Sequence, residues 1–290
     1  MLERKFTGYD TPMSQDEALK NNAIGQFLRA RRAELRPEQV GLPSGGNTRR
    51  VPGLRREEVA LLAGFSFDYY NRLEQGRLVP SFSALKALVN SLLLNSDQHA
   101  YLQRLVHASP GNSDLISNQA VGPQTSRLIK LIHSASVVVV GRYLDILAWN
   151  SVASALFLDF SKICVQERNF VRMAFLDAEF RSRYVDWNKS AKECVAYLRM
   201  EVSRNPSNPR LNALVKELSE KDSDFRTWWN SHQVAIPTCG QKSLIHPAAG
   251  LIALDWQMIG CSDDPEQMIY LMSAPAESPV TALLAGWQTM

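Results

Sequence analysis

Cysteine and histidine are scarce in this sequence, and neither residue is clustered. The cysteines lie far apart without a CxxC pair, and the five histidines show no metal-ligand spacing. This pattern predicts neither a disulfide framework nor a metal site. We expect buried, reduced thiols, with a redox or metal role as the alternative, at Cys164, Cys194, Cys239 and Cys261.

Long apolar runs are also missing. No stretch approaches the roughly 20 apolar residues that cross a bilayer as a helix. The first residues, MLERKFTGYD, lack the apolar core of a signal peptide. We therefore expect a cytoplasmic protein without a membrane partner.

Signatures of common enzyme classes do not occur in the chain. We find no GxSxG, HExxH or Walker motif, and no GxGxxG between a strand and a helix. The sequence therefore predicts no catalytic residue and no cofactor, and a structural role is favoured for the scattered histidines.

Net charge is small but unevenly distributed. The chain has 290 residues and a net charge of +3. Residues 1–109 carry 15 basic and 11 acidic side chains, whereas residues 110–290 carry 17 and 18. DNA binding uses such a basic excess, although this one is modest. Length and the break at SPGNSD, residues 109–114, predict two domains, 1–112 and 113–290.

The stretch GLRREEVALLAGFSFDYYNRLEQG, residues 53–76, predicts two short helices joined by a tight turn. Arg55–Ala63 has the apolar spacing of a helix laid against a core. Gly64 permits the turn, and Ser66 is a good N-cap for a second helix, Phe67–Gln75. Gly76 would end that helix. The pattern is that of a helix-turn-helix, and a helical hairpin with a solvated charged face is the alternative.

The second helix of such a motif enters the major groove of DNA, while the first crosses the backbone. Arg72 is suited to guanine and Asn71 to adenine, and Asp68 suits cytosine or the helix N-terminus. Arg55 and Arg77 flank the motif at the expected phosphates. The predicted DNA contacts are Arg49, Arg50, Arg55, Arg56, Ser66, Phe67, Asp68, Asn71, Arg72 and Arg77.

Further helices complete the first half of the chain. Residues 1–20 are predicted to form a loose arm, followed by an amphipathic helix, Ile24–Leu35, with Arg29 and Arg32 facing outward. A long loop carries Arg49 and Arg50, for which DNA contact and simple solvation are both open. Helices over 83–94 and 96–108 bring the unit to five helices.

The second half of the sequence differs from the first, because it contains runs typical of strands as well as predicted helices. Short β-branched or alternating runs at 136–141 and 143–149 predict paired strands, and Asn150 would cap the next helix. Helices are expected over 124–133, 166–175, 187–204, 210–220, 222–232 and 278–288, and strands over 234–239, 242–246, 251–259 and 267–273. This order suggests an antiparallel sheet with helices on one side.

Several motifs together resemble a known family. VPGLRREEVALLAG and YYNRLEQGR resemble the XRE-type, lambda-repressor-like helix-turn-helix of the bacterial MmyB-like transcription regulators. GRYLDILAWN, ERNFVRMAFLD, DWNKSAKECVAYLR, FRTWWNSHQV and HPAAGLIALDW resemble their ligand-binding domain. The resemblance implies an all-α DNA-binding domain joined to an α+β, PAS-like sensor domain, acting as a dimer on operator DNA.

A sensor pocket is the favoured function of the second half. Such pockets are mostly apolar, with a few polar groups that orient the ligand. The predicted contacts are Arg142, Trp149, Phe175, Trp187, Trp228, His232 and His246. We expect an elongated apolar or amphipathic effector, such as a fatty acid or a secondary metabolite. The alternative is an enzymatic or purely protein-binding domain fused to the DNA-binding module.

Overall fold

The structure is a computed structural model, and it describes residues 15–43, 51, 53–107, 119–203, 208–261, 264, 266–275 and 278–287. The chain forms two compact units, residues 1–112 and 113–290. The two-domain class, with an all-α unit followed by an α+β, PAS-like unit, is confirmed. No described helix combines the length and apolar character that a membrane crossing requires.

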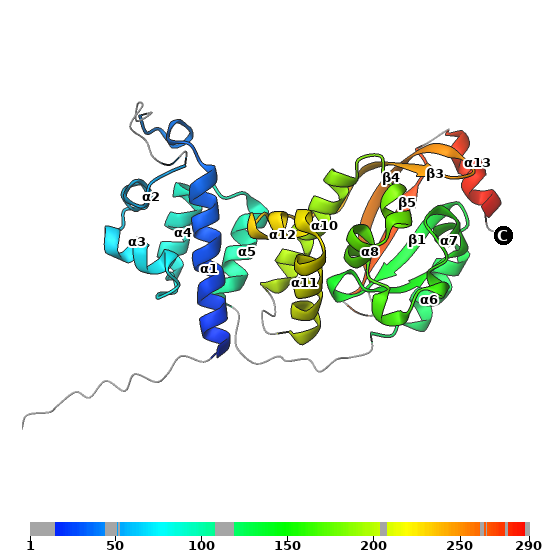
Figure 1. The fold of residues 1–290 in the computed structure, drawn as a ribbon, viewed down its shortest axis with the longest axis horizontal. Coiled ribbons are helices and arrows are strands. Elements are labelled where there is room, and N and C mark those ends of the chain that lie inside the picture. The colour runs from blue at the N-terminus through cyan, green and yellow to red at the C-terminus, as the bar shows by residue number, and fades with distance from the viewer. Residues whose placement is uncertain are drawn as a thin grey trace, which may run out of the picture. The chain divides into compact units, whose positions relative to one another are not determined.

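The first unit is a bundle of helices (Figure 1). Its elements are α1 (Gln15–Glu34), the 3-10 turn η1 (Pro37–Val40), α2 (Arg56–Ala63), α3 (Phe67–Glu74), α4 (Phe82–Ser91) and α5 (Ser96–His107). Helix α1 begins at Gln15, within the segment predicted to be a loose arm. Phe27 of α1 packs on Tyr101 of α5, with ring centres 5.1 Å apart. Both rings are fully buried, so they anchor the core of the bundle.

The second unit combines a sheet with short helices. Its helices are α6 (Pro123–Leu131), α7 (Ser151–Leu156), α8 (Phe170–Leu176), α9 (Ala178–Ser182), α10 (Trp187–Val202), α11 (Pro209–Lys221), α12 (Ser223–Asn230) and α13 (Pro279–Gly286). Its 3-10 turns are η2 (Arg142–Leu144), η3 (Phe160–Lys162) and η4 (Val165–Glu167). Its strands are β1 (Ala135–Val140), β2 (Ile146–Trp149), β3 (Cys239–His246), β4 (Gly250–Gly260) and β5 (Met268–Ser273).

The five strands form one antiparallel sheet in the order β2-β1-β5-β4-β3. Alternate residues of β1 point to opposite faces, and both faces are buried. Val138 and Val140 join the main core, whereas Val137 and Val139 pack with Ile129 of α6 on the other face. Helices therefore cover both faces of β1, which corrects the expectation of helices on one side only.

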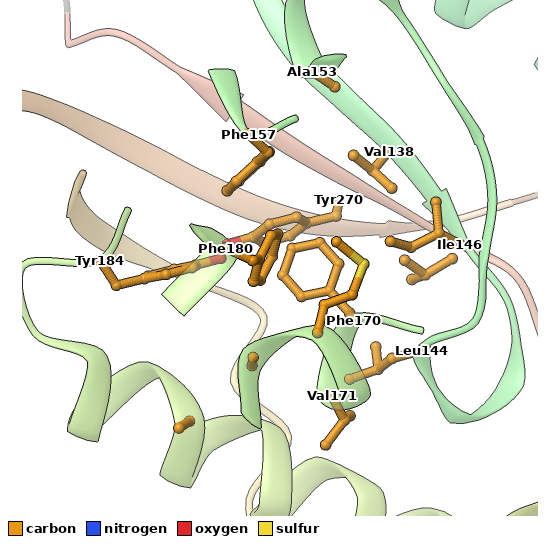
Figure 2. Close-up of a cluster of buried hydrophobic side chains, with 14 of the residues drawn as sticks. Val138, Leu144, Ile146, Ala153, Phe157, Phe170, Val171, Phe180, Tyr184 and Tyr270 are labelled. Atoms are coloured by element: carbon orange, nitrogen blue, oxygen red, sulfur yellow. The ribbon is translucent and has the colours of Figure 1, made fainter. Parts of the chain in front are cut away.

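Aromatic rings dominate the main core of the second unit. Phe170 lies at the centre of the cluster in Figure 2. Its ring centre is 5.1 Å from that of Phe180 and 5.5 Å from that of Tyr270, both edge-on. Edge-to-face pairs at this distance add stability beyond the area that they bury.

Buried asparagines fix the chain around this core. Asn150 caps α7 as predicted, because its Oδ1 accepts hydrogen bonds from the N–H groups of Val137 and Ala153. Its Nδ2 donates to the carbonyls of Ile132 and Ala135, both at 2.8 Å. One side chain thus joins the start of β1 to the start of α7.

Three local predictions are wrong. The segment 234–239 enters the sheet only at Cys239, since Pro237 has no N–H to give to a strand ladder. The helix expected over 166–175 begins at Phe170, because the side chain of Asn169 caps it there. The expectation of buried free thiols is wrong for Cys164 and Cys239, which are exposed; it is correct for Cys261, and Cys194 is half-buried.

Candidate nucleic-acid interface and ligand cavity

Helices α2 and α3 are joined as the sequence predicts. Gly64 has a φ of +70°, and the N–H of Phe65 donates to the carbonyl of Ala60. The hydroxyl of Ser66 accepts a hydrogen bond from the N–H of Tyr69 at 3.2 Å, which caps α3. Beyond α3, Gly76 adopts a φ of +69°. These contacts fix the turn of the helix-turn-helix.

Helix α3 has one buried and one open face. Tyr70, Leu73 and Glu74 are buried. The predicted DNA contacts Asp68 and Arg72 are exposed, and Phe67 at the start of the helix is 49% exposed. Asn71 is half-buried, and its Oδ1 accepts a hydrogen bond from Nε2 of Gln75 at 3.2 Å. The open face therefore offers an arginine, an amide, a carboxylate and an apolar ring within three turns of helix.

A buried carboxylate holds α3 to its neighbours. Glu74 is fully buried and accepts two hydrogen bonds from Arg32, at 2.8 and 2.9 Å, and one from Nε of Arg56 at 2.9 Å. Arg29 lies 3.5 Å away. Burial by itself would raise the pKa of Glu74, but the hydrogen bonds and positive charges of Arg32 and Arg56 outweigh it and lower that pKa.

This cluster changes the roles expected for two arginines. Arg32 does not face outward as predicted, because its guanidinium is bound to Glu74 and to the carbonyl of Leu54. Two nitrogens of Arg56 are likewise held by Glu74, which leaves only its remaining donors for DNA. Arg55 and Arg77 are exposed on either side of the motif. Arg49 and Arg50 lie outside the described residues.

The second unit contains a cavity between the sheet and α10. It encloses about 60 Å³ and opens to solvent. By this measure a single water needs roughly 10–15 Å³, so the enclosed part accepts a small ligand group and a longer chain would extend through the opening. The cavity is lined by Val140, Leu144, Phe170, Glu193, Cys194, Tyr197, Pro237, Lys242, Trp256, Met258 and Tyr270.

Charged groups of the cavity come from two elements. Nζ of Lys242, on β3, lies 3.1 Å from Oε2 of Glu193, on α10. Cys194 follows Glu193 on the helix, and burial raises the pKa of its thiol, which keeps it protonated. The cavity therefore has mostly apolar lining with one ion pair.

Trp256 owes its position to a glycine on the neighbouring strand. Gly240 pairs directly with Trp256 across β3 and β4. A Cβ atom at Gly240 would lie 3.0 Å from Nε1 of the indole, closer than side-chain carbons ordinarily approach. Because Gly240 has no side chain, the indole of Trp256 can lie across β3 beside the cavity.

Three aromatic residues predicted to contact ligand pack on one another, and their role in ligand binding stays a prediction. Ring centres of Phe175, Trp187 and Trp228 lie 5.5 to 5.9 Å apart. The guanidinium of Arg181 covers the Trp187 ring at 3.4 Å. None of the three lines the cavity, because they fill the contact between α8, α10 and α12.

The other predicted ligand contacts also lie away from the cavity lining. Arg142 forms an ion pair with Glu266, and Trp149 packs on Phe160. Nδ1 of His232 lies 3.0 Å from a guanidinium nitrogen of Arg199. Arg142, Trp149 and His232 therefore have structural partners, and a role in ligand binding stays a prediction for each of them.

His246 is held by backbone groups. Its Nδ1 accepts from the N–H groups of Ala248 and Ala249, so its Nε2 donates to the carbonyl of Ala155 at 2.9 Å. Burial lowers the pKa of His246, and the positive charge of Arg183 adds to this effect. The neutral imidazole is thus part of the fold of the β3–β4 turn.

Sequence reasoning missed Glu74, Glu193 and Lys242. Each is one member of an ion pair between elements that are far apart in the chain. A pattern of neighbouring residues carries no signal for such a pair, and the alternation of β3 around Lys242 was the only local hint that this lysine faces inward.

Comparison with known protein families agrees with this geometry. Residues 23–102 match the model of a helix-turn-helix domain. Residues 121–285, more than half of the chain, match the model of the MmyB-like transcription regulator ligand binding domain. No curated protein matches the chain. The protein therefore belongs to the MmyB-like transcription regulators, and it is a DNA-binding transcription regulator with a ligand-sensing domain.

Proposed function

We propose that the protein is a dimeric regulator whose affinity for operator DNA depends on a small, largely apolar or amphipathic ligand. The open face of α3 carries the DNA-binding part of this proposal, since Phe67, Asp68 and Arg72 are exposed while Tyr70, Leu73 and Glu74 fix the helix from behind. Arg72 and Asn71 read base edges. Arg55 and Arg77 contact phosphates, and the free donors of Arg56 supplement them.

The cavity supports the ligand-binding part of the proposal. An apolar lining with a few polar groups is typical of small-molecule sites. This lining favours a sensor over a domain that only binds proteins. The fatty-acid-like effector expected from the sequence fits with its polar end and first atoms inside and the rest of its chain in the opening.

A dimer supplies the link between ligand and DNA. Two recognition helices about 34 Å apart, one turn of DNA, bind two half-sites together. A ligand that binds one arrangement of the dimer better than another shifts the population and hence the operator affinity.

The test is to select DNA from a random duplex library with the full-length protein. We expect an enriched sequence with two related half-sites, about 10 base pairs apart between centres. Sedimentation of the protein on this duplex should show two chains bound. A single half-site occupied by one chain would contradict the dimeric mechanism, and no enriched sequence would contradict base readout by α3.

A second measurement concerns the ligand. Denaturing mass spectrometry of the purified protein should show a small amphipathic molecule released from it. If the purified protein is empty, an added amphipathic compound should change its DNA affinity. A protein that is empty, and whose DNA affinity responds to no amphipathic compound, would contradict the sensor function.

A further inference from the structure

The corner between β1 and β2 holds two residues in a backbone conformation that L-amino acids rarely adopt. Tyr143 and Leu144, in η2, have φ angles of +63° and +64°. This left-handed conformation costs free energy for a bulky side chain, and it occurs preferentially at binding sites and switches. The corner is therefore strained, and an arrangement with less strain competes with it.

Buried polar contacts hold the second part of the corner. Asn169 is fully buried, and its Nδ2 donates to the carbonyl of Tyr143 and to Oδ1 of Asp145. Nη2 of Arg210, on α11, donates to the same Oδ1 at 2.7 Å. Backbone strain persists only where surrounding contacts impose it, and these contacts do so here.

Leu144 also forms part of the cavity wall. It belongs to the buried cluster of Figure 2 and lines the cavity together with Val140, the last residue of β1. These two residues lie on either side of the turn, so a ligand in the cavity touches the corner directly. Apolar contact with Leu144 stabilises the strained arrangement, because the contact is made only in that arrangement.

The first part of the corner is attached to the segment that leads from the first unit. The N–H of Arg142 donates to Oε1 of Gln119 at 2.9 Å. A Cβ atom at Gly141 would overlap this oxygen, so the glycine makes room for the amide of Gln119. In the described part of the second unit, Gln119 is the residue nearest in sequence to the first unit. The corner thus holds the point at which the chain enters the second unit.

Two more contacts hold the residues next to Gln119. The carbonyl of Ala120 accepts a hydrogen bond at 3.1 Å from Nε2 of Gln267, and Val121 packs on the apolar cluster under α6. Gln267 follows Glu266, which forms an ion pair with Arg142 of the corner. The corner and the start of the second unit are therefore joined both directly and through this neighbouring segment.

From these observations we propose that the corner Gly141–Asp145 is a switch that transmits occupancy of the cavity to residues 119–121. The proposal rests on the proposed sensor function and names the route of its regulation. A ligand that contacts Leu144 keeps the corner in its strained arrangement, in which Arg142 holds Gln119. In the empty protein the relaxed arrangement is more populated, and Gln119 is released.

Release of Gln119 changes the reach of the chain between the two units. An extended residue spans about 3.3–3.6 Å, so detachment of residues 119–121 adds up to about 10 Å. This length is a sizeable fraction of one DNA turn, about 34 Å, at which two recognition helices must be spaced. The switch therefore alters operator affinity without any contact between the ligand and the DNA.

The first test measures the coupling between ligand and DNA in the full-length protein. Gln119→Ala removes the acceptor of the Arg142 N–H, and Gly141→Ala places a methyl group where Oε1 of Gln119 lies. Calorimetry with octanoate, a short fatty acid, should give a Kd within about twofold of the wild-type value in both variants. The effect of octanoate on the operator Kd should fall from about fivefold to less than about twofold. A fivefold effect retained in both variants would overturn the role of the corner.

Two further variants distinguish a specific contact from general damage. Gln119→Glu keeps an oxygen acceptor for Arg142 and should retain the coupling. Gln124→Ala changes an exposed glutamine of α6 and should retain it as well. Coupling lost in Gln124→Ala, or lost equally in Gln119→Glu and Gln119→Ala, would contradict a specific hydrogen bond. If Gly141→Ala fails to fold, these three variants still decide.

The second test needs no ligand. Cys194→Met enlarges a side chain of the cavity wall on α10 and fills part of the cavity. This variant should hold the corner as a ligand does, and so slow amide hydrogen exchange in residues 119–121 and 141–145 by about threefold or more. The same substitution at the exposed Cys164 should leave this exchange unchanged. Equal exchange in the two cysteine variants would contradict a link between the cavity and the corner.

The outcomes also separate this inference from the sensor function. An effect of octanoate on the operator Kd that survives in Gln119→Ala and Gly141→Ala would refute only the switch. Octanoate that binds without changing the wild-type Kd, together with equal exchange in the cysteine variants, would refute both. If calorimetry shows no binding of octanoate, the comparison of Cys194→Met with Cys164→Met decides alone.

Discussion

Glu74 and Arg32 lie 42 residues apart in the chain and share a two-pronged ion pair. Nε of Arg32 donates to Oε2 of Glu74 at 2.8 Å, and Nη2 donates to Oε1 at 2.9 Å. Arg56 of α2 donates to the same carboxylate. Since Glu74 is part of α3, this pair fixes the helix that carries the proposed base contacts to both α1 and α2.

Glu74→Ala should destabilise the first unit by about 3–5 kcal/mol, because it leaves the guanidinium of Arg32 buried without its partner. Glu57→Ala, which changes an exposed acid of α2, should change the stability of the first unit by no more than about 0.5 kcal/mol. Amide hydrogen exchange of peptides from α1 to α3 measures both effects. Equal exchange in the two variants would contradict a role for Glu74 in the stability of the bundle.

Arg72→Ala should weaken binding to the selected operator by about 1–3 kcal/mol and relax one base position, if Arg72 reads a base edge. Arg77→Ala, outside the helix, should weaken operator and random DNA alike and reduce the slope of affinity against salt. Fluorescence anisotropy at several salt concentrations distinguishes the two patterns. Unchanged discrimination between operator and random DNA in Arg72→Ala would assign Arg72 to the phosphates.

Asn150→Ala should destabilise the second unit by about 3 kcal/mol or more, because four backbone groups around the side chain lose a hydrogen bond at once. Asp186→Ala removes the cap of α10 and should cost about 1 kcal/mol. All six tryptophans lie between residues 149 and 287, so intrinsic fluorescence during urea unfolding reports on this unit. Similar losses in the two variants would mean that Asn150 acts only as a cap.

The second unit should lose stability as the pH falls through the titration range of His246. The pKa of His246 is lowered in the fold, so the unfolded chain binds the proton more readily. Above the ordinary histidine pKa, roughly 6.5, the neutral ring contributes fully to the free energy of unfolding. This contribution is lost as the pH falls from that value through the lower pKa of the folded state. His246→Gln should flatten this dependence between pH 7 and 5 in urea unfolding. An equal slope of the free energy of unfolding against pH in both proteins would contradict this role of His246.

The sequence was informative wherever a feature is local. As turn and cap residues, Gly64, Ser66 and Asn150 act on residues within a few positions, and these roles were predicted correctly. The resemblance to the MmyB-like family, carried by several such motifs, is likewise confirmed.

Features that join distant segments were not predictable in the same way. Arg32 was expected to face solvent, because a helical pattern cannot show that its guanidinium binds Glu74, 42 residues later in the chain. The residues Phe175, Trp187 and Trp228 were predicted to contact ligand from their type alone, and the sequence could not show that their rings pack on one another. The cavity depends on Glu193 and Lys242, which meet only when β3 closes the sheet beside α10.

The central claim is that occupancy of the cavity changes DNA affinity. The most direct measurement is the Kd of the full-length protein for its selected operator, by anisotropy, with and without saturating octanoate. We predict a change of about fivefold or more, in line with typical coupling between two sites. An identical Kd in the presence of octanoate that calorimetry shows to be bound would contradict the account.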